Sequence, residues 1–154
     1  MIESVLTTAL TVGDMERSLA FYRDLLGFEV AVELPPAAER ERWDLYHRRV
    51  SRIPGARIRV VYLRAPDGTT YLELIEYLEP KEPAPPRRRL HDPGAAIVAF
   101  SVRDSRAAVE LLRDAGVEVV ADPVHYRSDA GEETYTTYFS DPDGNVLCLF
   151  ETVG

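Results

Sequence analysis

Glu73 is the residue of this chain with the clearest capacity for chemistry. It stands in the mainly apolar run 70–77, which also contains Glu76 and whose alternation and β-branched residues predict a strand. Burying a carboxylate without a role is costly, so Glu73 is a candidate general acid or base, or a counter-ion for a cationic ligand group. The alternative is a carboxylate that only hydrogen-bonds within the protein interior.

Three further side chains are candidates for binding or catalysis. Cys148, the only cysteine, could be a nucleophile, although no histidine neighbours it in sequence and simple burial is the alternative. His125 lies in a long segment before a strand, where it could rim a pocket or be an exposed loop residue. Tyr135 and Tyr138 could stack on a ligand, but side chains alternate along a strand, so only one can face it. Of the two, we predict that Tyr138 binds the ligand.

An internal repeat places these residues. Ala-Leu-Thr-Val-Gly-Asp at 9–14 returns as Ala-Phe-Ser-Val-Arg-Asp at 99–104. Pro-Asp-Gly at 66–68 and Leu-Glu-Leu-Ile-Glu at 72–76 return as Pro-Asp-Gly at 142–144 and Leu-Cys-Leu-Phe-Glu at 147–151. Two copies of one unit predict a pseudo-twofold fold with its site between the copies. The repeat pairs Thr7 with Ile97 and Glu73 with Cys148.

Each copy is predicted to be a βαβββ unit, which makes the fold class α+β. The first unit has strands at 5–12, 28–34, 58–63 and 70–77, and a helix that begins after the N-cap Asp14 and ends at Gly27. The second has strands at 96–102, 117–120, 134–139 and 145–152, and a helix between Asp104 and Gly116. We therefore predict modules at 1–78 and 95–154, joined by a Pro/Arg-rich linker at 79–94.

One segment of the first module has no counterpart in the second. Trp43, Tyr46, His47 and Val50 have helical spacing, which predicts an inserted helix at about 36–53. This helix carries the only tryptophan, and it is either a lid over a pocket or a dimer contact.

Strand parity separates two faces of the predicted sheets. The bulky apolar face, which packs under the helices, comprises Leu10, Val12, Leu72, Leu74, Val98, Phe100, Val102, Leu147 and Leu149. The other face is smaller and mixed in polarity, as a ligand site would be, and comprises Thr7, Ala9, Thr11, Glu73, Ile97, Ala99, Ser101 and Cys148. Phe150 shares its parity with Cys148.

The two units, the run Asp-Met-Glu-Arg-Ser-Leu-Ala-Phe-Tyr-Arg-Asp-Leu-Leu-Gly-Phe at 14–28 and the turn Asp-Pro-Asp-Gly-Asn at 141–145 resemble the vicinal oxygen chelate superfamily. That superfamily groups glyoxalase I, bleomycin resistance proteins, extradiol dioxygenases, fosfomycin resistance enzymes and methylmalonyl-CoA epimerase. The resemblance covers nearly the whole chain outside the inserted helix and the linker. It implies a cupped, pseudo-twofold, eight-stranded sheet with helices on its outer face.

In metal-dependent members, each module typically supplies one ligand from its first strand and one from its last. The resemblance places these positions at Thr7, Ile97, Glu73 and Cys148, and only Glu73 matches the usual pattern. Isoleucine has no lone pair and a neutral threonine hydroxyl is a poor ligand for a divalent ion. The three histidines lie outside these positions. We therefore predict a site without a metal and without another cofactor.

Three functions fit these residues. The first is metal-independent binding of a small organic molecule, such as a natural product, in the cup between the modules, as in bleomycin resistance proteins. The second is an enzyme that uses Glu73 as general acid or base in isomerase, lyase or cyclisation chemistry. The third is a glyoxalase- or dioxygenase-type metalloenzyme with unusual ligands. The predicted ligand-binding residues are Thr7, Thr11, Ile97, Ser101, Cys148, Phe150, Trp43, Tyr46, His125 and Tyr138.

Composition argues against several other classes. The 154 residues are 45% hydrophobic and 29% charged, an ordinary globular balance for one compact domain or two small modules. The net charge of −8 argues against a nucleic-acid surface, and no apolar run approaches the ~20 residues that span a membrane. No signal peptide is visible, so we expect a cytoplasmic protein. The resemblance implies a homodimer.

Overall fold

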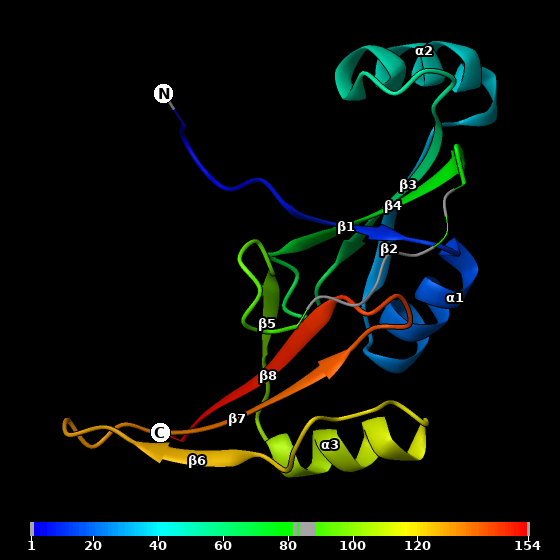
Figure 1. Ribbon diagram of the computed structural model, residues 1–154. Helices are drawn as coiled ribbons and strands as arrows, with labels where there is room; N and C mark the ends of the chain where they lie inside the picture. The colour runs from blue at the N-terminus through cyan, green and yellow to red at the C-terminus, as the bar shows by residue number, and fades with distance from the viewer. Residues whose placement is uncertain (1, 82, 84–88, 154) are drawn as a thin grey trace. The chain divides into compact units, whose positions relative to one another are not determined.

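The computed structural model of the chain describes residues 2–81, 83 and 89–153 (Figure 1). The chain separates into two compact units, Met1–Pro85 and Pro86–Gly154, and each contains one four-stranded sheet. The division falls in the predicted linker 79–94, of which residues 82 and 84–88 lie outside the described residues.

The first unit holds eight elements. In chain order they are β1 (Thr8–Val12), α1 (Met15–Leu19), the π-helical turn η1 (Ala20–Leu25), β2 (Glu29–Leu34), the 3-10 turn η2 (Ala37–Glu39), α2 (Arg40–Ser51), β3 (Arg57–Arg64) and β4 (Tyr71–Glu79). The second unit holds β5 (Ile97–Ser101), α3 (Ser105–Asp114), β6 (Val124–Arg127), β7 (Glu133–Ser140) and β8 (Val146–Val153). Among the described residues, none of the helices combines the length and the apolar composition that crossing a membrane requires.

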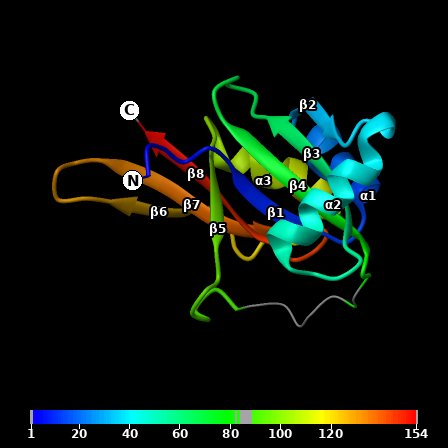
Figure 2. The ribbon, with the colours of Figure 1, turned by 90° about the horizontal axis from the view of Figure 1, so that it is seen from above.

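The two sheets share one topology, which confirms the internal repeat and the α+β fold. Their strand orders are β1-β4-β3-β2 and β5-β8-β7-β6, and Figure 2 shows the strands of the first sheet side by side. In each sheet the first and last strands of the unit pair in parallel, and the other pairs are antiparallel. Ala9 pairs with Glu73 and Ala99 with Cys148, which is the equivalence that the repeat predicted.

The predicted helix boundaries are confirmed in both units. The carboxylates of Asp14 and Asp104 each accept a hydrogen bond of 3.0 Å, from the backbone N–H of Arg17 and Ala107 respectively. Gly27 has φ 79°, and this left-handed conformation stops the first helical segment at low steric cost.

The predicted apolar face forms the core of each unit. Leu72 and Leu74 of β4, and Leu147 and Leu149 of β8, are all buried. In the second unit, Val98, Phe100 and Val102 are only half-buried. Figure 1 shows α1 and α2 on opposite sides of the first sheet, so both of its faces are at least partly covered.

One predicted strand is wrong and one begins later than predicted. Residues 117–120 contribute only an isolated bridge between Val119 and Phe139, and the edge strand is β6 instead. Residues 124–127 form the edge strand because the turn that follows them closes a hairpin with β7. In this turn the N–H of Ser128 donates to the carbonyl of Glu132 at 2.8 Å. The first strand, predicted to begin at residue 5, begins at Thr8.

Candidate functional site

Glu73 and Tyr62 lie side by side on the face of the first sheet that is opposite α1. They are direct partners in the register between β3 and β4, so their side chains share this face, which we call the α2 face. The Tyr62 hydroxyl donates a hydrogen bond to the Glu73 carboxylate. Burial, the adjacent negative charge of Glu73 and this hydrogen bond all raise the pKa of Tyr62. At neutral pH the pair is therefore a carboxyl group with a protonated phenol held against it.

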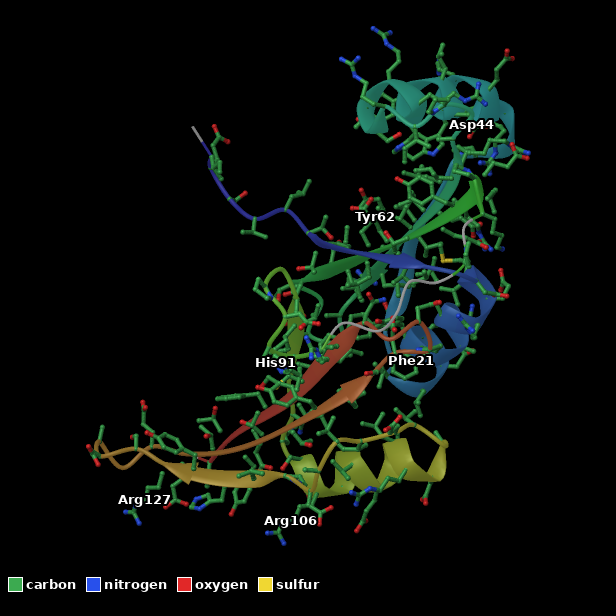
Figure 3. The ribbon with its side chains drawn as sticks, in the orientation of Figure 1. Phe21, Asp44, Tyr62, His91, Arg106 and Arg127 are labelled. Atoms are coloured by element: carbon green, nitrogen blue, oxygen red, sulfur yellow. The ribbon has the colours of Figure 1, made fainter. Side chains whose placement is uncertain are left out.

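The inserted helix presents an aromatic cluster to this pair. The rings of Trp43, Tyr46 and His47 lie on one side of α2, with centroid distances of 4.5 Å between Trp43 and His47 and 4.9 Å between Tyr46 and His47. Tyr46 lies close enough to Tyr62 to contribute to its raised pKa. Figure 3 shows Tyr62 on the side of β3 toward α2.

Two nitrogen atoms of the aromatic cluster are buried without a partner. Within the part of the chain that the structure describes, neither Trp43 Nε1 nor His47 Nε2 has a hydrogen-bond partner. Burial lowers the pKa of His47 against the opposing effect of Asp44, so its imidazole is neutral at pH 7. A buried polar atom without a partner costs about 1–3 kcal/mol, and a water or a ligand oxygen is the usual way to satisfy it.

Polar contacts to residues 56–58, where β3 begins, hold α2 in place. Arg40 donates to the carbonyl of Ile58 at 2.7 Å, and Arg48 donates to the carbonyl of Ala56 at 3.1 Å. The carboxylate of Asp44, which is only 5% exposed, lies 3.6 Å from Arg57. These contacts position the aromatic cluster relative to the sheet that carries Glu73.

The second unit repeats the arrangement with different chemistry. Tyr138 is the register partner of Cys148, as Tyr62 is of Glu73, so Tyr138 and not Tyr135 shares the face of Cys148. Cys148 is 5% exposed, and burial raises the pKa of its thiol. At neutral pH the thiol is protonated, which is the unreactive form.

The remaining predicted residues of the second unit divide between the two faces of its sheet. Ile97, Ser101 and Phe150 are exposed on the face of Cys148. His125 is not a loop residue, because it lies on β6 opposite Tyr135, on the other face. Its Nε2 lies 3.2 Å from Glu133, and its ring centroid lies 4.9 Å from that of Tyr135.

The donor set at the four superfamily ligand positions does not suit a metal ion. Thr7, just before β1, donates its hydroxyl to the carbonyl of Tyr71 at 3.1 Å, and Ile97 has no donor atom. Thr11 is exposed on β1, on the face of Glu73. Among the described residues, no three His, Cys, Asp or Glu side chains come together in a way that could hold a metal.

Two residues of this site, Tyr62 and His47, were missed as site residues from sequence. The signal for Tyr62 was its place in a strand next to the one that carries Glu73, but the register between the strands decides whether they meet. His47 was recognised as part of the inserted helix, and its helical spacing from Trp43 was the available signal. The direction in which that helix docks is set by contacts distant in sequence.

The paired βαβββ units define the class, and comparison with known proteins agrees. The chain belongs to the Glyoxalase/Bleomycin resistance protein/Dioxygenase superfamily, whose family model matches residues 4–149. A 2-epi-5-epi-valiolone epimerase from Actinomyces sp is 32% identical over 145 residues, which are 92% of this chain and 75% of that protein.

Solved structures share the fold at lower identity. A glyoxalase family protein from Bacillus cereus matches with a TM-score of 0.82 and 21% identity, covering 100% of this chain and 97% of the other. TnmS3, an antibiotic binding protein from Streptomyces sp. CB03234, matches with a TM-score of 0.63 and 21% identity, covering 99% and 98%. At these identities the likeness concerns the fold alone.

Proposed function

We propose that this protein binds a small organic molecule, without a metal, at the α2 face of the first sheet. The observation that carries the proposal is the hydrogen-bonded pair of Tyr62 and Glu73 facing an aromatic cluster with two unpartnered nitrogen atoms. The cluster can stack on a planar or apolar ligand group. Glu73 can accept from a ligand hydroxyl or pair with a ligand cation.

Fluorescence tests this proposal directly, because Trp43 is the only tryptophan. We expect saturable quenching or enhancement when the protein is titrated with a panel of cationic and aromatic natural products. Glu73→Gln should weaken the binding of a hit by about tenfold, as expected for loss of a hydrogen bond to a charged group. Glu110→Gln makes the same change at an exposed position on α3 and should leave binding unchanged. A panel without any binder would contradict the proposal.

A second candidate function is isomerase-type catalysis, which the epimerase relative favours. Glu73 would remove the proton from a carbon next to a ligand carbonyl, and the electron pair of that C–H bond would form an enolate. The Tyr62 hydroxyl would then hydrogen-bond the enolate oxygen. Protonation of the opposite face by a water molecule would invert the carbon, and Glu73 would release its proton to the resulting hydroxide.

Proton exchange distinguishes the two functions. An isomerase should replace the hydrogen next to the carbonyl of a cyclic polyhydroxy ketone by deuterium in D₂O, which NMR detects. Glu73→Gln should abolish this exchange while the ketone still binds. Binding without exchange by the wild-type protein would favour the first function.

We also propose that the protein is a cytoplasmic homodimer, as the superfamily resemblance implies. Light scattering coupled to size-exclusion chromatography should report the mass of two chains, and a mass of one chain would refute the dimer. Cell fractionation tests the location.

A further inference from the structure

We propose that a second site, between α2 and the start of β3, binds a small molecule through its phosphoryl group. The site is a pocket of about 430 Å³. This volume falls within the usual range for small-molecule sites. Its lining residues are Ala37, Ala38, Arg40, Glu41, Asp44, Arg48 and Arg57.

The pocket is distinct from the site that Glu73 and Tyr62 form. Arg40, Asp44 and Arg48 are spaced four residues apart, so they lie on one side of α2. Trp43 and Tyr46 lie on another side of the same helix, and neither they nor Glu73 line the pocket. The proposal therefore does not depend on the proposed function.

Three guanidinium groups are held at this pocket by contacts that leave donors available. Arg40 and Arg48 each donate to a backbone carbonyl of the segment at the start of β3. Arg57 donates to the Glu79 carboxylate at 3.2 Å. Each guanidinium carries several N–H donors in a planar fork that matches phosphate oxygens, so these contacts orient the groups without exhausting them.

Asp44 organises the arginines and does not cancel them. Its buried carboxylate lies 3.5 Å from Arg40 and 3.6 Å from Arg57, so it holds these two guanidinium groups near each other. Glu41, the other acidic lining residue, is exposed. Among the lining residues, three arginines exceed two acids; Glu79, which pairs with Arg57 from outside the lining, is exposed. The lining therefore carries a net positive charge, which attracts anions.

The surrounding charge strengthens this preference. Residues 40–57 contain six arginines and two acidic residues, a net charge of +4 in a chain whose net charge is −8. A cluster of basic residues on an acidic protein steers anions to that part of the surface. A phosphoryl group offers three acceptor oxygens and a charge of about −1.5 to −2, whereas a carboxylate offers two oxygens and a single charge, so three arginines favour a phosphoryl group. Ala37 and Ala38 leave room for the molecule that carries it.

Isothermal titration calorimetry at low ionic strength, with inorganic phosphate and glycerol 3-phosphate as probes, tests the proposal. Both should bind, and glycerol 3-phosphate should bind more tightly. Arg57→Gln should weaken binding by about tenfold or more, the usual effect of removing a charge-assisted hydrogen bond. Arg49→Gln removes the same charge from α2 at an exposed position outside the pocket. It should change binding by no more than about twofold, because water separates this side chain from the bound anion.

Glu41→Gln should increase the affinity for phosphate, a result that is not expected if the arginines of the pocket serve only to hold α2 in place. Because Glu41 is exposed, the variant should fold normally, and removal of its negative charge should tighten phosphate binding by about twofold to fivefold. Equal weakening by Arg49→Gln and Arg57→Gln would overturn the proposal in favour of non-specific attraction. Acetate binding as tightly as phosphate, or no binding of either phosphate at about 10 mM, would also overturn it.

Discussion

A double-mutant cycle on Tyr62 and Glu73 tests the pair on which both proposed functions rest. Tyr62→Phe removes only the donor and Glu73→Gln removes only the charge, so both changes preserve shape. A hydrogen bond to a charged group is worth about 1.5–3 kcal/mol when fully buried. Both side chains are half-buried, and solvent screening reduces the expected coupling to about 1 kcal/mol.

Urea denaturation of the wild type, both single variants and the double variant gives this coupling energy. Each single variant should be destabilised, and the double variant should lose less stability than the sum of the two. Additivity within about 0.3 kcal/mol would refute the pairing of Tyr62 with Glu73.

A control cycle uses Glu33→Gln with Tyr62→Phe. Glu33 lies on the other face of the sheet, where Arg59 donates to its carboxylate at 2.7 Å, and it should show no coupling to Tyr62. Loss of the Glu73 charge should also lower the pKa of Tyr62, which ultraviolet absorbance of the phenolate measures.

Three other predictions concern the inserted helix, the cysteine and a helix cap. Burial depresses the pKa of His47 below its usual value of 6.5, so the unfolded state binds more protons just below that pH. The free energy of unfolding should therefore decrease as the pH is lowered below 6.5. In urea titrations, His47→Gln should show a smaller decrease. Cys148 should react with Ellman's reagent at least about tenfold more slowly in the native protein than in urea, because the thiol is buried and its pKa is raised, and equal rates would show that it is accessible. Asp104→Ala should lower the free energy of unfolding by about 1 kcal/mol through loss of the α3 cap, and an unchanged urea midpoint would contradict that role.

The repeat, the helix boundaries and the buried faces were predictable from sequence because their signals are local. An aspartate before a helix and a glycine after it act within one turn of backbone, as at Asp14 and Gly27. Alternation along a strand sets which side chains share a face, so the burial of Leu72 and Leu74 followed from parity. Comparison of the two copies also identified the equivalence of Glu73 and Cys148.

Only the tertiary structure decided which residues meet. The partner of Glu73 depends on the register between β3 and β4, and the choice of edge strand in the second unit depends on hairpin closure; neither is a local property. The pocket at Arg40 and Arg57 forms because the inserted helix docks on the start of β3 through backbone carbonyls. Sequence determined the elements and their faces because backbone geometry repeats with a known period. Register and docking were left to the fold because they are set by long-range contacts, and those contacts build both proposed sites.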